Sequence, residues 1–275
     1  MTSGAARSSG GGKRPQFRNA DLHLAAWLPS RLAAKKSAFT LAEVLITLGI
    51  IGVVAAITLP TLIQNYQKQV WVNQLKKTYT TLNEGFKQMA ASEGCTTLRC
   101  ADISWDSNLV GFDFTKAKTK EKFVKTFKLE NVYVGGAPSN SIYNYKIKDL
   151  LGNEGSFSDF FVTNYNSCLV GITSSGKVIS FVDLAFSPLI VVDINGLKSP
   201  NTIGRDIFVF SGFDFNDTAM VEPWLSKKFY EGRSNEISEE ERIQFINDDC
   251  VTTDTTTGGW ACAEKIIMDG WKMNY

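Results

Sequence analysis

The sequence FTLAEVLITLGIIGVVAAITLPTLIQNYQ occupies residues 39–67. Residues 44–63 of this stretch contain no charged side chain, and Glu43 is the only charge between Lys36 and Lys68. About 20 apolar residues in an α-helix span the roughly 30 Å hydrocarbon core of a lipid bilayer. The stretch therefore predicts a transmembrane helix.

A secretory signal peptide is the alternative explanation of the same apolar run. Val54 and Ala56 are small enough for a signal peptidase, which would cleave after Ala56 and leave a chain that begins at Ile57. An acidic residue at the head of the run, Glu43, argues against a signal peptide.

The apolar pattern continues after the run with the spacing of a helix. Apolar residues recur at intervals of three to five positions, namely Tyr66, Val70, Leu75, Tyr79, Leu82, Phe86 and Met89. A single helix over residues 39–92 would be roughly 80 Å long at 1.5 Å per residue. Its first half is apolar all round and suits lipid, whereas its second half is amphipathic and suits a globular domain. Pro60 lies inside it and predicts a kink, because proline removes one backbone hydrogen bond.

Basic residues are concentrated before the apolar run. The whole chain has 29 Lys and Arg against 28 Asp and Glu, a net charge of +1. Residues 1–38 hold seven of the basic residues and one acidic residue, so this leader carries +6 and the remainder −5. A basic flank before a transmembrane helix indicates the cytoplasmic side. A disordered basic tail or a nucleic-acid-binding arm is the alternative.

Composition also limits the chemistry of the chain. The hydrophobic fraction of 44% is enough for a folded core. The only histidine is His23, in the leader. Once the leader is removed, no imidazole remains for Ser-His-Asp or Cys-His catalysis or for a histidine-ligated zinc. We therefore expect a protein that is not an enzyme.

Residues 95–275 predict a globular domain of mixed α and β structure. Runs of β-branched and aromatic residues, separated by Gly, Asn, Ser and Pro, predict a small antiparallel sheet. These runs are residues 143–147, 160–162, 168–173, 178–184, 189–194 and 206–210. Helices are expected at 115–129, at 238–249, where Ser238 and Glu241 form a capping-box pattern, and at 263–269.

The junction KKSAFTLAEVL, residues 35–45, resembles the signal of type IV prepilins and type II secretion pseudopilins. The resemblance implies cleavage between Ala38 and Phe39 by a prepilin peptidase and N-methylation of Phe39. Glu43 becomes the fifth residue of the mature chain, and Pro60 matches a proline common in the family helix. The chain departs from the commonest pattern at Ala38, where the family prefers glycine.

The resemblance also implies a fold and a function. The fold is α+β and pilin-like, with a long N-terminal helix packed on a small antiparallel β-sheet domain. Its parts are a cleaved leader (1–38), a transmembrane half-helix (39–63), an amphipathic half-helix (64–94) and a globular domain (95–275). The subunit would cross the inner membrane once with its N-terminus in the cytoplasm. It would then join a type IV pilus or a pseudopilus through other pilin subunits and an assembly platform in the inner membrane.

The carboxylate of Glu43 fits this resemblance. An ionised carboxylate inside a bilayer costs roughly 2.5–3.5 kcal/mol, so it needs a partner. The methylated amine of Phe39 on a neighbouring subunit would supply one when the helices bundle. The alternative is a carboxylate that sits in the headgroup region without a specific role.

A second stretch, VVDINGLKSPNTIGRDIFVF at residues 191–210, resembles a VDxNGxKxPNxxGxDxF segment of pilin-like bacterial proteins. Asp193, Asn195 and Asp206 carry side-chain oxygens on turns, which suit Ca²⁺. The spacing is not that of an EF-hand, and scaffolding of the turns by Asx hydrogen bonds is the favoured role. No other cofactor is expected.

The cysteines suit an exported domain. Cys250 and Cys262 lie near the C-terminus, where type IV pilins often close a loop with a disulfide, and Cys95 and Cys100 are close enough to bridge locally. Cys168 lies in an apolar run and is expected to be a buried thiol. The alternative is that all five cysteines are reduced.

Two other functions remain open. One is a signal-anchored extracytoplasmic binding protein or adhesin that does not polymerise. The other is a membrane-anchored enzyme, although no catalytic constellation without histidine is evident. The lysines of residues 115–129 are read as a solvated face, so no nucleic-acid partner is expected.

Overall fold

The computed structural model describes residues 39–103, 112, 114–135, 141–157, 168–184, 187–216, 218–227, 237–252 and 258–275. The leader, with His23 and Ala38, and the strand expected at 160–162 lie outside the described residues. The chain divides into two compact units, Met1–Val53 and Val54–Tyr275, and the boundary falls within the first helix.

Helix α1 runs from Leu41 to Ala91 without interruption and contains Pro60. Among the described helices it is the one long and apolar enough to cross a membrane. Its most apolar stretch has a mean hydropathy of 2.3, and no residue of that stretch is buried. Because these apolar side chains have no protein cover, lipid or other helices must supply it. The predicted transmembrane helix is therefore supported by length, hydropathy and exposure.

The second part of α1 buries one face in the Val54–Tyr275 unit. The buried residues are Val72, Leu75, Thr78, Leu82, Gly85, Phe86, Met89 and Ala90. The predicted stripe was wrong at its start, because the side chain of Tyr66 is 68% exposed. Partial cover of the helix begins at Lys68, which contacts the C-terminal residue Tyr275, and Val72 is the first buried residue.

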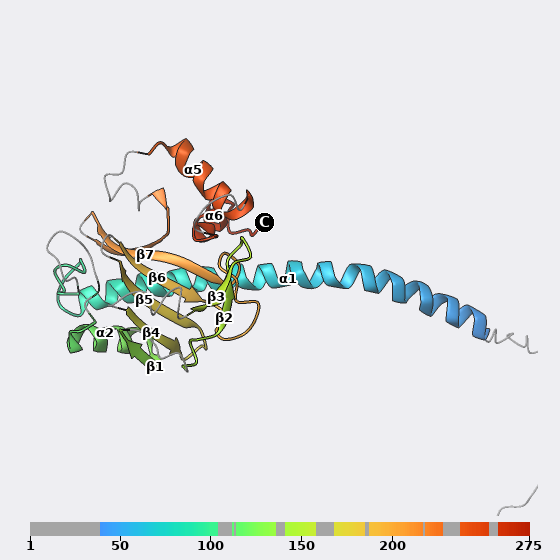
Figure 1. Cartoon of the computed structure of the whole chain (residues 1–275), viewed down its shortest axis with the longest axis horizontal. Helices are drawn as coiled ribbons and strands as arrows, with labels where there is room; N and C mark the ends of the chain where they lie inside the picture. The colour runs from blue at the N-terminus through green and yellow to red at the C-terminus, as the bar shows by residue number, and fades with distance from the viewer. Residues whose placement is uncertain are drawn as a thin grey trace, which may run out of the picture. The chain divides into compact units, whose positions relative to one another are not determined.

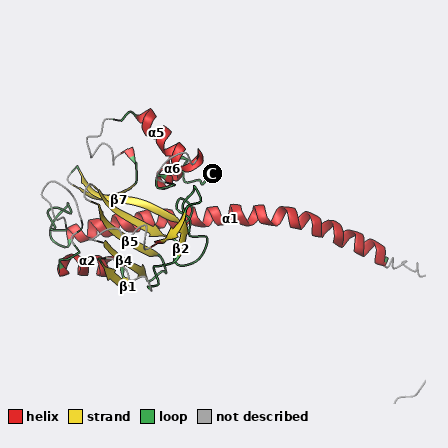
Figure 2. Ribbon diagram, viewed as in Figure 1, coloured by secondary structure: helices red, strands yellow, loops and turns green. Residues whose placement is uncertain are grey.

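The globular part is built on a six-stranded antiparallel sheet in the order β1-β4-β5-β6-β7-β8. Its strands are β1 (Leu129–Val134), β4 (Cys168–Thr173), β5 (Val178–Leu184), β6 (Ser187–Asp193), β7 (Ile207–Phe215) and β8 (Thr218–Pro223). A separate two-stranded sheet pairs β2 (Lys146–Lys148) with β3 (Glu154–Ser156). Figures 1 and 2 show the second part of α1 running along the larger sheet. The predicted α+β, pilin-like fold class is confirmed.

Each central strand sends alternate side chains to two cores. On β7, Phe208 and Phe210 join the core that contains α1, whereas Ile207 and Val209 join a second core on the other face. Successive side chains of a strand point to opposite faces, so a sheet covered on both sides reads as a continuous apolar run. This explains why the runs at β5, β6 and β7 lack polar alternation.

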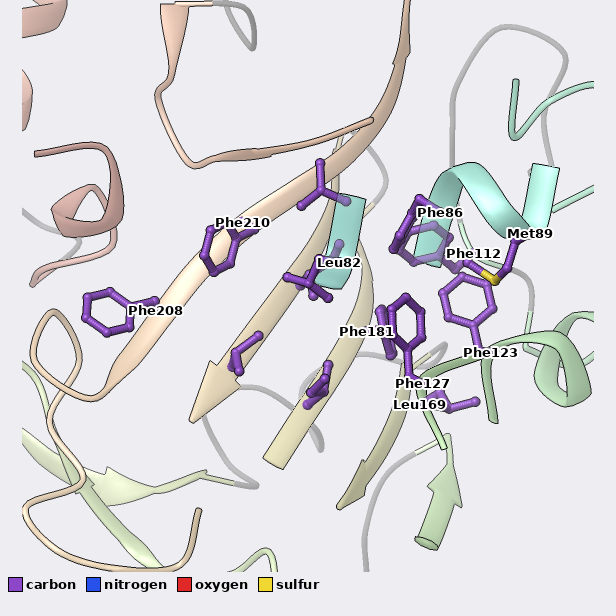
Figure 3. Close-up of a cluster of buried hydrophobic side chains, with 14 of the residues drawn as sticks. Leu82, Phe86, Met89, Phe112, Phe123, Phe127, Leu169, Phe181, Phe208 and Phe210 are labelled. Atoms are coloured by element: carbon purple, nitrogen blue, oxygen red, sulfur yellow. The ribbon is translucent and has the colours of Figure 1, made fainter. Parts of the chain in front are cut away.

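A cluster of phenylalanines joins α1 to the sheet (Figure 3). Helix α2 (Ala117–Phe127) contributes Phe123 and Phe127, which meet Phe86 of α1 and Phe181 of β5. The rings of Phe123 and Phe181 lie 4.8 Å apart, edge to face. Such pairs contribute roughly 0.5–1.5 kcal/mol beyond their buried area.

Side chains from α1 and the residues after it cover the outer edge of β8. The Asn83 amide donates to the Val221 carbonyl oxygen (2.8 Å) and accepts from the Val221 N–H (3.0 Å). The Ala219 N–H donates to the Thr96 carbonyl oxygen (2.8 Å). An uncovered edge would offer these groups to another strand. Asn83 therefore ends the sheet at β8.

The C-terminal part consists of α5 (Glu239–Asn247), a π-helical turn η1 (Asp248–Thr252) and α6 (Cys262–Met268). The predicted capping box at α5 is present, because Ser238 and Glu241 each accept a hydrogen bond from the other's backbone N–H. Arg242, only 5% exposed, donates to Glu264 of α6 at 3.0 Å and to Glu239. This buried ion pair holds α5 on α6.

Candidate functional site

The N-terminal end of α1 carries the residues expected to act in processing and assembly. Phe39 is 84% exposed and lies two residues before Leu41, the first residue of α1. The Thr40 N–H and hydroxyl both donate to the same Glu43 carboxylate oxygen, at 2.8 and 2.9 Å. The Glu43 N–H donates to the Thr40 hydroxyl at 3.2 Å. Thr40 and Glu43 thus form a capping box that begins α1.

The capping role of Glu43 was not predicted from the sequence. The pattern was available, because Thr40 and Glu43 stand three residues apart immediately before an apolar run. A capping box gives the carboxylate a partner within its own chain, in addition to any partner on a neighbouring subunit. Glu43 therefore has two separable roles to test.

The apolar surface that follows Glu43 is exposed on all sides of the helix. Its large side chains include Leu45, Ile46, Leu48, Ile50, Ile51, Val53, Val54, Ile57, Leu59, Leu62 and Ile63. Pro60 lies among them and has no N–H to donate to the preceding turn. The kink expected at Pro60 stays a prediction.

The turn between β6 and β7 places the candidate calcium ligands inside the fold. Asp193 accepts hydrogen bonds from the Tyr145 hydroxyl (2.7 Å) and the Asn195 N–H (3.2 Å). Asp206 accepts them from the N–H groups of Asn201 (2.8 Å) and Thr202 (2.6 Å). Each of the four carboxylate oxygens therefore already has a donor from the chain.

Burial raises the pKa of both carboxyl groups. Removal from water raises the pKa of Asp193 to about 8, despite the hydrogen bond from Tyr145. Burial also raises the pKa of Asp206, against the opposing effect of the Thr202 and Asn201 N–H groups. Each oxygen keeps a second acceptor position, but the bonds already made tie both carboxyl groups to the turn, so the geometry favours the scaffold role. Calcium binding at Asp193, Asn195 and Asp206 stays a prediction.

The cysteines lie in two bonded pairs and one single residue. Disulfides join Cys95 to Cys100 and Cys250 to Cys262. Cys168 on β4 is buried and lies outside any disulfide. The first disulfide closes the turn after α1, and the second ties η1 to the start of α6.

A possible metal cluster in the described residues consists of Asp249, Cys250 and Cys262. The two sulfurs are bonded to each other, so neither is the thiolate that a metal needs. Asp249 accepts from the N–H groups of Gly259 (3.0 Å) and Ala261 (2.7 Å). The group is therefore a structural support of the loop before α6.

Lysines of α2 and Lys116, which immediately precedes it, have acidic neighbours. Glu93 pairs with Lys118 (3.1 Å) and Lys122 (2.9 Å), and Asp102 pairs with Lys116 (3.4 Å). These pairs neutralise part of the basic face and join α2 to the end of α1. The arrangement favours a solvated structural face.

Comparison with known families identifies one segment. A family model described as the prokaryotic N-terminal methylation motif matches residues 33–59. The match covers the junction of Ala38 and Phe39 together with Glu43, and it ends one residue before Pro60. No curated protein and no solved structure matches the chain.

Proposed function

We propose, from the prepilin-type signal that this chain carries at residues 33–59, that the protein is a pilin-like structural subunit. A prepilin peptidase processes it, and it assembles into a type IV pilus or a type II secretion pseudopilus. The observation that carries this proposal is the methylation motif at the head of an exposed apolar helix.

Processing begins in the inner membrane. The basic leader, residues 1–38, stays in the cytoplasm and the globular domain, residues 95–275, is exported, as the positive-inside rule predicts. The peptidase cuts between Ala38 and Phe39 and methylates the new amine of Phe39. The exposure of Phe39, next to the first turn of α1, suits access by a second protein.

Assembly follows from the surface of α1. Its apolar side chains are uncovered in the single chain, so they are buried either by lipid or by the helices of neighbouring subunits. The Glu43 carboxylate of one subunit pairs with the Phe39 amine of the next. Such a contact joins two different surfaces and repeats without closing, which generates a helical filament.

The signal-anchored binding protein remains a second candidate, because one observation favours it. The Thr40 hydrogen bonds already explain Glu43 as a helix cap, without any neighbouring subunit. Under that hypothesis the charge of Glu43 is dispensable as long as the cap survives.

The direct test is the intact mass and N-terminal sequence of the protein isolated from its native membranes. Processing predicts a chain that begins at N-methyl-Phe39. A chain that begins at Ile57 indicates signal-peptidase cleavage, and an uncut chain that begins at Met1 indicates a plain anchor. Either result overturns the filament-subunit proposal.

A further inference from the structure

A polar pocket of about 450 Å³ lies between α1 and the C-terminal residues, within the Val54–Tyr275 unit. One wall is the helix surface from Asn65 to Asn73, and the other is the segment from Trp271 to Asn274. Figure 1 shows the C-terminal end beside this part of α1.

The pocket begins where the apolar surface of α1 ends. Ile63 is the last residue of the apolar run, and Asn65 and Lys68 follow it by two and five positions. At 1.5 Å per residue these side chains lie roughly 3–8 Å beyond the apolar run. The headgroup layer on each side of a bilayer is about 5–7 Å thick. Asn65 and Lys68 thus stand at headgroup depth when the apolar run is in the membrane.

The lining of the pocket is cationic and rich in amides. Lys68 and Lys272 contribute positive charge, and no carboxylate side chain lines the pocket. Lys68 donates one of its three N–H groups to the main-chain oxygen of Tyr275, the last residue of the sequence, so that oxygen competes with a ligand for its charge. Lys272 is exposed. Asn65 and Asn73 offer amides that suit hydroxyl groups.

One aromatic side chain, Trp271, lines the pocket, and a second, Tyr66, lies on the same stretch of α1 outside the lining. Trp271 is half-buried, packed against Tyr79 (ring centroids 6.2 Å apart) and under the Lys76 ammonium, 5.4 Å from the ring centroid. Tyr66, on the next turn of α1 after Ile63, points into solvent instead of the core. Trp and Tyr are enriched at headgroup level in membrane proteins. A position at the membrane–water interface would therefore explain why the Tyr66 side chain is exposed.

We propose that this pocket binds the phosphate and hydroxyl groups of an anionic glycerophospholipid headgroup while the subunit is anchored in the membrane. The inference rests on the membrane-anchored state in the proposed function. Lys68 and Lys272 contact the phosphate, and the exposed Leu62 and Ile63 lie beside the acyl chains. The subunit gives up this lipid when it leaves the membrane for the filament.

A lipid fits the pocket better than free phosphate does. A free anion needs only charge, whereas this pocket holds charge and amides and begins at Asn65, two residues along α1 from the exposed Ile63 and three from the exposed Leu62. A phospholipid presents the same three features in the same order. The two ligands are separable by competition.

The test uses the full chain in detergent micelles, with bound lipid measured by native mass spectrometry. The chain should retain phosphatidylglycerol in preference to phosphatidylcholine. Lys272→Gln should weaken that retention about fivefold, because one cation near an anionic lipid contributes roughly 1 kcal/mol. Lys125→Gln, which removes an exposed lysine of α2, is the matched control and should leave retention unchanged.

Several outcomes overturn the inference. Equal retention of the two lipids removes the headgroup preference, and equal losses in Lys272→Gln and Lys125→Gln indicate diffuse electrostatic attraction. Displacement of phosphatidylglycerol by millimolar inorganic phosphate indicates a free-anion pocket. Membrane fractionation of the same chain separates the two proposals. A chain absent from membranes contradicts the proposed function, whereas an anchored chain without lipid preference contradicts only this inference.

Discussion

Thr40 and Glu43 cap each other at the start of α1, with the Thr40 N–H 2.8 Å from the Glu43 carboxylate. A capping box accepts glutamine as well as glutamate at its third helical position. The pairing of Glu43 with the amine of a neighbouring subunit requires the negative charge. Conservative substitution of Glu43 therefore separates the cap from the assembly contact.

We predict that Glu43→Gln keeps the protein processed and membrane-bound but prevents its recovery in sheared filaments, as Glu43→Ala does. The reason is that glutamine preserves the Thr40 bonds and cannot neutralise the buried amine of the next subunit. Immunoblots of membrane and sheared fractions measure both properties. Normal filaments from Glu43→Gln, combined with failure of Glu43→Ala, would show that only the cap matters.

Long, strongly apolar segments were the easiest to predict from the sequence. The strands β5, β6 and β7 were found because their residues are buried on both faces of the sheet, and α1 was found because its first half is a long apolar run. The edge strands β1 and β8 were missed, since polar residues such as Glu130 and Glu222 interrupt their apolar pattern. The features that were not predicted depend on contacts between residues that lie far apart in the sequence. The bonds of Asn83 to β8 and of Arg242 to Glu264 join residues 138 and 22 positions apart, and neither local pattern indicates them.

The hydrogen bonds between Asn83 and the outer edge of β8 are expected to stabilise the fold. Asn83→Ala leaves the N–H and carbonyl of buried Val221 without the partners that Asn83 provides. We expect the free energy of unfolding to fall by about 1–3 kcal/mol, the usual cost of unsatisfied buried polar groups. Urea denaturation of the full chain in detergent measures it. Lys87→Ala, one turn further along α1 and exposed, is the control and should stay within about 0.5 kcal/mol. Equal effects of the two substitutions would show that the Asn83 bonds contribute little.

The buried carboxyl of Asp193 predicts a pH dependence. Its folded pKa of about 8 lies above the unfolded value near 4, so the folded state binds the extra proton. Stability from this group is complete below pH 4 and is lost as the pH rises through 8. Asp206, also raised, acts in the same direction. Asp193→Asn should flatten the fall in unfolding free energy between pH 4 and 8, measured by urea denaturation at several pH values. A slope unchanged by the substitution would assign the dependence to other groups, Asp206 first among them.

The two disulfides give a matched pair of variants. Cys250 and Cys262 are 12 residues apart in sequence, and Cys95 and Cys100 are 5 apart. The loop-entropy relation gives about 3 kcal/mol for the longer loop and about 2 kcal/mol for the shorter one. We expect Cys250→Ser with Cys262→Ser to lower the free energy of unfolding more than Cys95→Ser with Cys100→Ser. The longer loop also holds η1 against α6, where Asp249 accepts two backbone N–H bonds, so its loss should increase proteolysis near residue 250. Denaturation and limited proteolysis of the oxidised full chain test both effects. The reverse order of stability would show that the short bridge after α1, and not the C-terminal loop, is the main covalent support of the domain.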